Sequence, residues 1–400
     1  MIPVDQARRQ ILAVCAPLAP RGVARGDARG CVSAEAVVST EDVPPFANTA
    51  MDGYAVRAAD TAGAPVRLDV VDTLAAGAPP RVTVGTGQAV RIMTGAPMPA
   101  GADAVVMVEH TRALDGGTGV EVDVVTSVGD HVRAAGSDLA AGQRVLGPGA
   151  VLGPGHLGVL ASIGRERVMV VPRARVGVLS TGDELVDGGG PLRPGQIRDS
   201  NRPTLVALVA EAGCEPVDLG LAADDEGSLA AAVADGVARC DALVTSGGVS
   251  VGDFDYMKAV LDRLGSMQWW QVAVRPAKPL AFGLIGSTPV FGLPGNPVSS
   301  MVSFELFARP ALRQMMGHGA LDRPRVTAVA DEALVRRRDG KLHLLRMVAT
   351  QDGDGRWHVR SSGGQGSHML AAMARANALA VVPDGDGVPA GDDVEVMLLA

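Results

Sequence analysis

The chain has 400 residues, of which 47% are hydrophobic and 20% charged, and its formal net charge is -8. This balance is typical of folded globular proteins, and the length suits several domains of about 100 to 200 residues each. The acidic charge argues against a nucleic-acid-binding surface, and no apolar run reaches the roughly 20 residues that span a bilayer, so we expect a cytoplasmic protein without nucleic-acid or membrane partners.

The first predicted element is an amphipathic helix over residues 3–18, where apolar side chains recur at helical spacing. Short valine-rich runs broken by Gly and Pro then indicate a small, mostly β domain over residues 46–141. Residues 142–173 are rich in Gly and Pro and contain a short apolar helix candidate at 156–163. We interpret this segment as the return connection from an inserted domain.

Strands and helices alternate over residues 174–317, which predicts βαβ units and a doubly wound, mostly parallel sheet. The candidate elements are strands at 176–180, 215–220 and 242–246 and helices at 202–212, 226–239 and 256–264. Residues 318–400 show short strand-like runs at regular spacing and one short helix candidate near 367–374. This last part is expected to form a small β domain.

The loops that follow the predicted strands carry the candidate site, because ligands of doubly wound sheets bind outside the carboxyl ends of the strands. These loops lie at 180–184, 224–225, 246–253 and 294–297. Glycines in the third and fourth loops let backbone N–H groups approach a phosphate closely at the start of a helix. A tight strand-to-helix turn with a helix cap is the alternative interpretation of each loop taken alone.

Carboxylates on these loops suggest a divalent cation. Asp224 and Asp255 follow different strands of the same predicted sheet, so they could meet across the cleft and hold Mg²⁺ through oxygen ligands. The neighbouring Asp225 and Glu226 are better explained as solvated acids that the helix dipole stabilises.

Two cations lie in the stiff loop Arg-Pro-Ala-Lys-Pro, which contains Arg275 and Lys278. Rigid cations beside anion-binding loops could fix a compact tetrahedral oxyanion, and ordinary surface charge is the alternative. In the inserted domain, Asp52 and Thr94 lie in polar turn segments, which alone are consistent with hairpin chemistry.

Histidines and cysteines form no catalytic or metal-binding pattern. The histidines lack HxH or HxxxH spacing, and Cys15, Cys31, Cys214 and Cys240 lack CxxC spacing, so we expect buried free thiols. The SGGVS segment at 246–250 lacks the G-x-S-x-G elbow, so no Ser-His-Asp arrangement is predicted.

Six motifs occur in a characteristic order: NTAMDGYAV, RIMTGAPMP, STGDEL, QIRDSNRP, TSGGVSVGDFDYMK and FGLPGNPVS. Together they resemble the molybdopterin molybdenumtransferases (the MoeA family, related to the gephyrin E domain) over almost the whole chain. The resemblance implies a multidomain α/β protein with four parts. They are an elongated helical or mixed domain of residues 1–45 and 142–173, an inserted mostly-β domain of 46–141, a molybdopterin-binding α/β domain of 174–317 and a C-terminal β barrel of 318–400.

The resemblance also implies roles for individual residues. Catalytic roles fall on Asp52, Thr94, Glu184, Asp224, Asp255 and Lys278. The metal ligands would be Asp224 and Asp255. Pterin or nucleotide contacts fall on Thr181, Gly182, Asp183, Ser246, Gly247, Gly248, Ser250, Gly295, Asn296 and Pro297. Molybdate contacts fall on Arg275, Lys278, Ser299, Arg346 and Ser367.

The implied reaction inserts molybdate into adenylyl-molybdopterin and releases AMP, as a step of molybdenum cofactor biosynthesis. The dithiolene sulfurs would take up molybdate while carboxylates place Mg²⁺ and cations neutralise oxyanions. The implied assembly is a homodimer whose cleft is completed by the neighbour's inserted domain. Transient contacts with the molybdopterin adenylyltransferase and with molybdoenzyme chaperones are also expected.

Two departures from the family's pattern bear on these expectations. RPAKP stands where the family commonly has KPGKP, so the planar guanidinium of Arg275 replaces a compact ammonium. Ala134 and Ala135 stand where arginines often occur, which predicts a less positive substrate channel.

Two alternative functions stay open. A molybdopterin adenylyltransferase would prepare the pterin rather than insert the metal, but such relatives typically carry GGTG where this chain has GGVS at 247–250. A gephyrin-like binding scaffold is the second alternative, for which we would expect a long linker or a fused enzyme domain.

Overall fold

The computed structural model describes residues 1–248, 256–353 and 355–399. The chain forms two compact units. Unit 1 comprises Met1–Arg21, Gly30–Val32 and Val170–Ala400, and unit 2 comprises Gly22–Arg29 and Ser33–Met169. Within the described residues, no helix combines the length and the apolar character that crossing a membrane requires.

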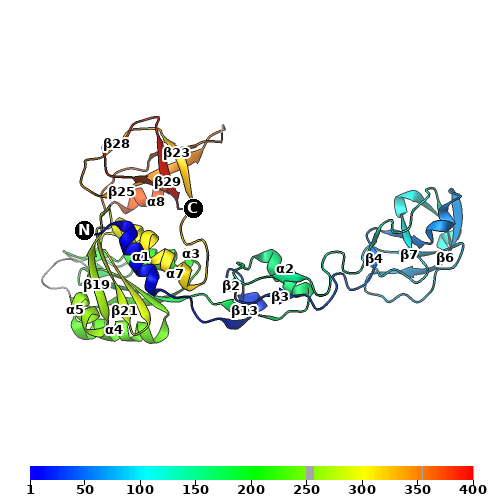
Figure 1. Cartoon of the computed structure of the whole chain (residues 1–400), viewed down its shortest axis with the longest axis horizontal. Coiled ribbons are helices and arrows are strands. Elements are labelled where there is room, and N and C mark those ends of the chain that lie inside the picture. The colour runs from blue at the N-terminus through cyan, green and yellow to red at the C-terminus, as the bar shows by residue number, and fades with distance from the viewer. Residues whose placement is uncertain (249–255, 354, 400) are drawn as a thin grey trace. The chain divides into compact units, whose positions relative to one another are not determined.

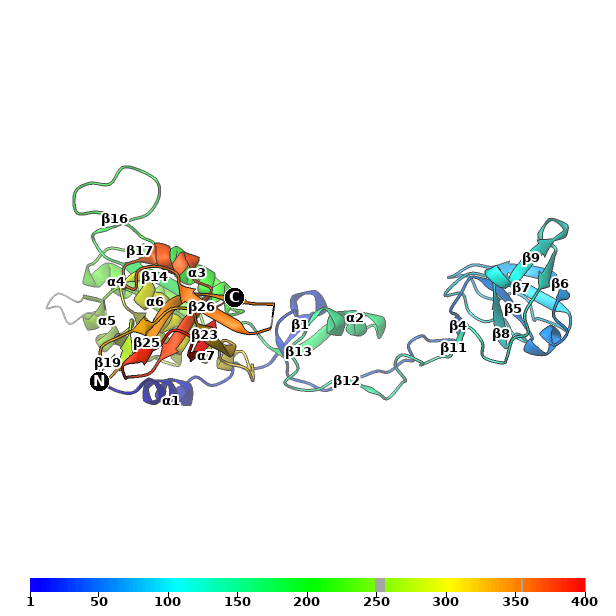
Figure 2. The ribbon, with the colours of Figure 1, turned by 90° about the horizontal axis from the view of Figure 1, so that it is seen from above.

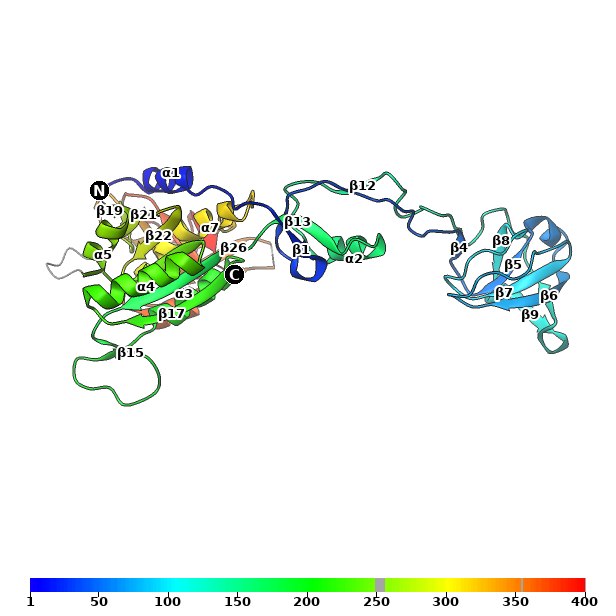
Figure 3. The same cartoon turned by 90° about the horizontal axis from the view of Figure 1, so that it is seen from below.

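Unit 2 is built on a six-stranded sheet in the order β8-β5-β7-β6-β10-β9. The strands are β5 (Gly53–Val56), β6 (Val66–Leu74), β7 (Gln88–Ile92), β8 (Ala104–Met107), β9 (Thr111–Leu114) and β10 (Gly119–Val122). Successive strand residues point to opposite faces, and here both faces are covered: Tyr54 and Val56 pack in one apolar cluster and Ala55 in another. Apolar side chains are therefore buried on both faces of this sheet, whose strands β5, β7 and β8 are labelled in Figure 3.

The segments that lead into and out of this sheet run as antiparallel pairs. The pairs are β3 (Val37–Val38) with β12 (Arg144–Leu146) and β4 (Asn48–Thr49) with β11 (Val132–Arg133). Between them, the backbone N–H of Val43 donates to the carbonyl of Leu139 over 2.7 Å. The chain thus enters and leaves the sheet at adjacent points, as an inserted segment must. The predicted limits of the inserted domain, residues 46–141, stay a prediction.

The remaining elements of this stretch are short. They are β1 (Arg21–Ala24), the 3-10 helix η1 (Arg25–Asp27), β2 (Val32–Ser33), η2 (Ala58–Thr61), η3 (Val108–His110), η4 (Asp115–Gly117), α2 (Pro154–Ser162) and β13 (Arg167–Val171). Helix α2 corresponds to the apolar helix expected at 156–163, and Pro154 occupies its first turn, where a missing N–H costs nothing.

The main sheet of unit 1 has the order β17-β14-β18-β22-β21-β19. Its strands are β14 (Arg175–Thr181), β17 (Glu215–Ala222), β18 (Ala242–Ser246), β19 (Ser266–Gln271), β21 (Pro279–Ile285) and β22 (Thr288–Leu293). The first four strands of that order are parallel, and β21 and β19 join antiparallel. The predicted mostly parallel sheet is confirmed, and its central strands are buried apolar runs because helices cover both faces.

Those helices divide between the two faces (Figure 1). They are α1 (Val4–Val14), α3 (Asn201–Glu211), α4 (Glu226–Arg239), α5 (Tyr256–Leu264), α6 (Pro297–Ser303), the π-helical turn η5 (Phe304–Ala308) and α7 (Arg309–Met315). Helices α1, α3 and α7 share one apolar cluster, and α4 and α5 share another. The first helix is shorter than predicted: it ends at Val14 because Pro17 disfavours helical geometry in the residue before it.

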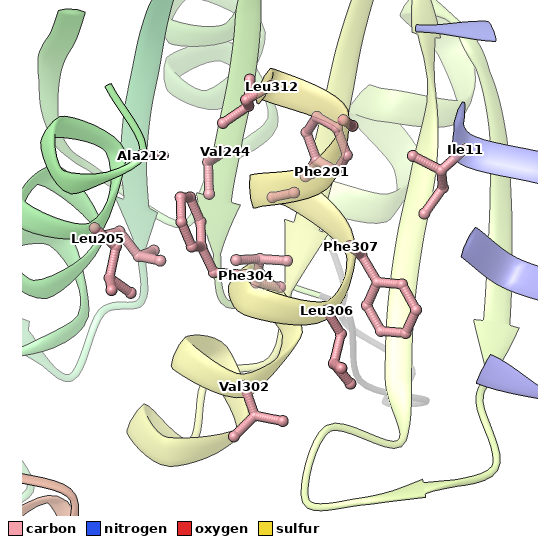
Figure 4. Close-up of a cluster of buried hydrophobic side chains, with 14 of the residues drawn as sticks. Ile11, Leu205, Ala212, Val244, Phe291, Val302, Phe304, Leu306, Phe307 and Leu312 are labelled. Atoms are coloured by element: carbon pink, nitrogen blue, oxygen red, sulfur yellow. The ribbon is translucent and has the colours of Figure 1, made fainter. Parts of the chain in front are cut away.

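The larger cluster is drawn in Figure 4. Phe304 and Phe307 extend from the helix that follows β22 and pack with Leu205 of α3, Phe291 of β22 and Ile11 of α1. Both phenylalanine side chains are fully buried. Truncating such a ring to alanine typically costs about 3 to 5 kcal/mol, so this cluster fixes the sheet whose strand ends carry the candidate site.

The C-terminal strands form a closed barrel, as expected. They are β23 (Arg325–Ala330), β25 (Leu342–Gln351), β26 (Trp357–Ser361), β27 (Ala378–Val382) and β29 (Asp393–Leu398), with α8 (Leu370–Arg375) and the pair β24 (Leu334–Val335) and β28 (Gly387–Val388) alongside. The β25–β27 pairing closes the ring. A short strand before β21, β20 (Val274–Arg275), pairs in parallel with β25 and ties the barrel to the α/β part of unit 1.

Between β14 and α3 the chain makes an excursion that contains β15 (Leu185–Val186) and β16 (Ile197–Arg198), which pair in parallel. The loop between them projects from the sheet in Figure 2. Its base is held by Arg202, which forms ion pairs with Asp187, Asp199 and Asp218. The excursion therefore begins and ends at a fixed point beside the strand ends.

Candidate functional site

Three of the predicted loops meet in one cavity of about 300 Å³, which we call the strand-end cavity. It is lined by Thr181, Glu184, Leu185, Ile197, Arg198, Asp199, Ser200, Asn201, Ser246, Gly247, Gly295, Asn296, Pro297 and His368. The loops after β14, β18 and β22 contribute to it because these parallel strands end at the same edge of the sheet.

Asn201 ties two of these loops together. Its Nδ2 donates to Ser246 Oγ and to the carbonyl of Gly295, both over 2.7 Å. Asp199 in turn fixes the start of α3, because its Oδ1 accepts the backbone N–H groups of Asn201 and Arg202 over 3.1 Å. Sequence reasoning quoted the motif that contains these residues but assigned them no role.

Glycine is required where the loop after β18 passes β14. Gly247 has a φ of 94°, which favours glycine, and a Cβ there would lie 2.8 Å from the carbonyl oxygen of Thr181. The predicted glycine-rich turn thus allows two backbones to approach closely. Gly248 also has positive φ but does not line the strand-end cavity, whereas the predicted Ser250 lies outside the described residues.

An acidic group borders the end of β14. Asp224 accepts a hydrogen bond from the Thr181 hydroxyl over 3.3 Å, and its backbone N–H donates to Asp183 over 3.2 Å. Burial raises the pKa of Asp224, the Thr181 bond opposes this, and repulsion from Asp183, Glu184 and Asp225 raises the pKa further. A divalent cation would relieve that repulsion.

The magnesium hypothesis stays a prediction. Asp224 and Glu184 offer the hard oxygen ligands that Mg²⁺ prefers, but the second predicted ligand, Asp255, lies outside the described residues. Among the described residues, no group of three or more His, Cys, Asp or Glu side chains has the geometry to hold a metal. All four cysteines are buried free thiols, as expected.

A second cavity, of about 310 Å³, collects positive charge, and we call it the basic cavity. It is lined by Val274, Arg275, Pro276, Ala277, Lys278, Pro279, Ser299, Lys341, Gln365, Gly366 and Ser367. Four of the five predicted molybdate contacts, Arg275, Lys278, Ser299 and Ser367, therefore face one space. Sequence reasoning missed Lys341 and Gln365.

The backbone of the RPAKP loop is unusual at its centre. Ala277 has a φ of 83° although it is not glycine, and it is buried. This conformation costs a non-glycine residue roughly 1 to 2 kcal/mol. The departure from KPGKP therefore carries a backbone cost at Ala277 as well as the change of cation at Arg275.

The fifth predicted contact, Arg346, lies behind the basic cavity and does not line it. Its side chain is fully buried, and Nη2 donates to the carbonyls of Gly364 and Gly366 over 2.8 and 3.2 Å. Its Nε and Nη1 atoms have no hydrogen-bond partner among the described residues, and burial lowers the pKa of the guanidinium. Arg346 thus supports the loop that carries Gln365 and Ser367.

In unit 2, Asp52 and Thr94 lie together. The backbone N–H and the hydroxyl of Thr94 donate to Asp52 Oδ1 over 2.6 and 2.7 Å. These two hydrogen bonds lower the pKa of Asp52, so its carboxylate is ionised and held in one orientation. The two turn segments that the sequence analysis singled out thus form one polar site of unit 2.

Comparison with family models matches nearly the whole chain. Residues 2–164 match the MoeA N-terminal region (domain I and II), residues 177–314 a probable molybdopterin binding domain, and residues 332–399 the MoeA C-terminal region (domain IV).

Curated relatives match at full length. The chain is 37% identical over 398 residues to the molybdopterin molybdenumtransferase of Haemophilus influenzae, covering 99% of this chain and 98% of that one. It is 39% identical over 408 residues to molybdopterin molybdenumtransferase 2 of Mycobacterium tuberculosis, covering 98% of each.

Solved structures agree with these matches. The molybdopterin biosynthesis moeA protein from Pyrococcus horikoshii OT3 is similar with a TM-score of 0.77 and 27% identity, covering 100% of both chains. A second structure of a Pyrococcus moeA protein is similar with a TM-score of 0.80 and 30% identity, covering 100% of this chain and 99% of that one.

Proposed function

Because the chain belongs to the molybdopterin molybdenumtransferase (MoeA) family and is a transferase of molybdenum cofactor biosynthesis, we propose that it inserts molybdate into adenylyl-molybdopterin and releases AMP. The observation that best supports the proposal is the adjacency of the two cavities. Ser367 lines the basic cavity, and the next residue, His368, lines the strand-end cavity. A substrate with a phosphate at one end and an oxyanion acceptor at the other fits this arrangement.

The backbone holds the two cavities in a fixed relation. The N–H of Val298, at the start of α6, donates to the carbonyl of Ser367 over 3.1 Å. Helix α6 begins with Pro297 of the strand-end cavity and contributes Ser299 to the basic cavity. Reacting groups bound at the two places would therefore be held at a constant separation, which lowers the entropic cost of reaction.

Each cavity has a distinct part in the proposed reaction. In the basic cavity, Arg275 and Lys278 would neutralise the molybdate dianion while the hydroxyls of Ser299 and Ser367 donate hydrogen bonds to its oxygens. In the strand-end cavity, Ser246 and the backbone at Gly247 and Gly295 would hold the phosphate-bearing part of the pterin substrate.

We propose Mg²⁺ as the metal that accompanies the substrate. Asp224 and Glu184 would supply oxygen ligands, and the raised pKa of Asp224, due first to burial and further to its acidic neighbours, supports a cation there. Bound Mg²⁺ supplies neutralisation of phosphate charge. The chain's own residues orient the substrate: Thr181 holds the Asp224 carboxylate and Asn201 holds the two loops.

The direct test uses the purified full chain with adenylyl-molybdopterin, molybdate and Mg²⁺, and measures AMP. We expect AMP release that requires all three additions. AMP formation that is independent of molybdate would contradict the proposal. Pyrophosphate release from ATP and molybdopterin would instead indicate an adenylyltransferase.

We also propose a homodimer in the cytoplasm. Light scattering should give twice the mass of the 40.8 kDa chain, and cell fractionation should recover the protein with cytoplasmic markers. A monomer that turns over at full rate would refute the dimer proposal.

A further inference from the structure

Lys341 shares the basic cavity with Arg275 and Lys278, although it comes from the barrel and they come from the α/β part of unit 1. The parallel pairing of β20 with β25 sets its place. In this pairing Val274 lies beside Leu342 and Arg275 beside His343, and the N–H of Leu342 donates to the carbonyl of Ala273 over 2.9 Å. Lys341 directly precedes β25, so its backbone position relative to the RPAKP loop is fixed.

Asp339 holds the side chain of Lys341. Its Oδ2 lies 3.1 Å from Lys341 Nζ, and its Oδ1 accepts the backbone N–H of Lys341 over 3.2 Å. Arg336 and His343 also bond to the same carboxylate, over 3.0 and 3.1 Å. Lys341 is therefore oriented before any ligand binds. Its side chain loses less conformational entropy on binding an anion than a free surface lysine would lose.

The turn that carries Asp339 is itself rigid. The buried guanidinium of Arg336 donates to the carbonyls of Lys341, Val382 and Pro383 over 2.8, 3.1 and 2.7 Å. It also pairs with Asp384. The lysine is thus anchored through its own carbonyl as well as through its side chain and its backbone N–H.

The charges at the basic cavity do not balance. No ion pair links Arg275 or Lys278 to a carboxylate among the described residues, and the described lining of the cavity includes no acid. Arg336 pairs with Asp384 as well as with Asp339, and Lys341 pairs with Asp339. Among the described residues of the cavity, the charges without a partner are therefore those of Arg275 and Lys278. Although burial opposes it, hydrogen bonds from Lys341 and His343 and their charges lower the pKa of Asp339 to about 2. Asp339 therefore stays ionised and paired at neutral pH.

We propose that Lys341 is a third cationic binding residue for the tetrahedral dianion, acting together with Arg275 and Lys278. This inference rests on the proposed function, because it assigns Lys341 to the same oxyanion site. The third charge selects for a dianion over a monoanion of the same shape, since each added cation contributes more to the binding of the ion that carries more charge. A purely structural ion pair with Asp339 is the competing explanation.

The test measures binding of molybdate, and of the monovalent tetrahedral ion perrhenate, to the full chain by calorimetry. Lys341→Met keeps the length of the side chain and removes its charge. We expect molybdate to bind about tenfold more weakly, equivalent to about 1.4 kcal/mol, and perrhenate about threefold more weakly. Lys341→Arg should restore most of the affinity. Arg360→Gln removes an exposed positive charge from β26 of the same barrel and should change neither affinity.

Asp339→Asn separates the two explanations by the sign of its effect. If Lys341 only stabilises the barrel through Asp339, then Lys341→Met and Asp339→Asn should both lower the melting temperature and leave molybdate binding unchanged. If Lys341 binds the anion, Asp339→Asn removes a competing negative charge while its amide oxygen can still accept from Lys341, so molybdate binding should tighten, whereas Lys341→Met weakens it.

Lys278→Ala distinguishes failure of this inference from failure of the proposed function. If Lys278→Ala weakens molybdate binding and Lys341→Met does not, the inference about Lys341 is wrong and the oxyanion site stands. If the unmodified chain and all variants bind molybdate equally poorly, the oxyanion site itself is wrong. If the Lys341→Met protein does not fold, Lys341→Arg and Asp339→Asn are compared instead. Near-normal molybdate binding by the first and tighter binding by the second support the inference.

Discussion

The strand-end cavity and the basic cavity both adjoin the loop that carries Ser367 and His368, but different kinds of side chain line them. The lining of the strand-end cavity includes glycines, hydroxyls and two asparagines, together with the carboxylates of Glu184 and Asp199 and the guanidinium of Arg198. The basic cavity contains three cations and no acid among its described lining residues. Backbone donors suit an extended ligand whose shape must be matched, whereas fixed charges suit a small, highly charged ion. Under the proposed function, the chain would recognise adenylyl-molybdopterin mainly by geometry and molybdate mainly by charge.

The largest expected effect concerns Asp224, in the acidic group at the end of β14. Asp224→Asn should reduce Mg²⁺-dependent AMP release at least about 100-fold, because loss of even an indirect metal partner typically costs about 10- to 100-fold. Turnover measured against Mg²⁺ concentration tests this. Asp225→Asn is the matched control, since its carboxylate caps α4 by accepting the N–H of Ser228 over 2.9 Å and asparagine caps equally well. Equal losses in both variants would remove Asp224 from the metal site.

The next effect concerns the tie between the loops of the strand-end cavity. Asn201→Ala removes two hydrogen bonds of about 0.5 to 1.5 kcal/mol each, so KM for adenylyl-molybdopterin should rise by about 30-fold. The molybdate dependence should stay the same. Thr204→Ala on the same helix, whose hydroxyl donates to the Ser200 carbonyl, is the control and should leave KM unchanged. A parallel loss of molybdate affinity would mean that the two cavities are not independent.

A smaller effect is expected in the basic cavity. Lys278→Ala should raise the molybdate concentration for half-maximal activity about tenfold, because charge-assisted hydrogen bonds in a partly dehydrated pocket are stronger than exposed ion pairs. Binding of adenylyl-molybdopterin should change little. Arg275→Lys should be mild, since the cation is kept. Equal losses for pterin and molybdate would assign the loop to the pterin phosphate instead.

The smallest expected effect is on stability. The pKa of Asp224 is raised in the folded state, first by burial, so the folded protein holds that proton at a pH where the unfolded chain has released it. Stability therefore falls as pH rises through this window, and above it the charged carboxylate costs folding energy. Without Mg²⁺, Asp224→Asn should melt slightly higher than the unmodified chain at neutral pH and equally at acidic pH. A lower melting temperature at neutral pH would show that the carboxylate stabilises the fold.

Much of the α/β fold could be predicted because its signals are local. The apolar runs that became β14 and β18 are buried on both faces, and α4 between β17 and β18 buries Leu229, Val233 and Gly236 at helical spacing. The end of α1 was misplaced by a few residues, since its apolar spacing continues past the point where Pro17 stops the helix. The closing β25–β27 pair of the barrel joins distant segments, which no local pattern reveals.

The candidate site was predictable only where a motif carries its own chemistry. The glycines and cations of the loops could be recognised from the sequence. The hydrogen bonds of Asn201 could not, because its partners lie 45 and 94 positions away in the chain. Lys341 sits in an Asp-Gly-Lys turn that is typical of a solvated surface, and only the β20–β25 pairing brings it to the basic cavity. Arg346 was assigned by resemblance, and its position behind the cavity depends on the path of residues 364–366.

The paired flanks of unit 2 have a consequence for engineering. Because Val43 and Leu139 are joined by a backbone hydrogen bond, the chain between them begins and ends at adjacent points. Segments with adjacent ends are the ones that tolerate excision, transplantation and circular permutation. Residues 44–138 can therefore be treated as a removable cassette: a short turn could close the gap, and a foreign domain with similarly spaced termini could be grafted in its place.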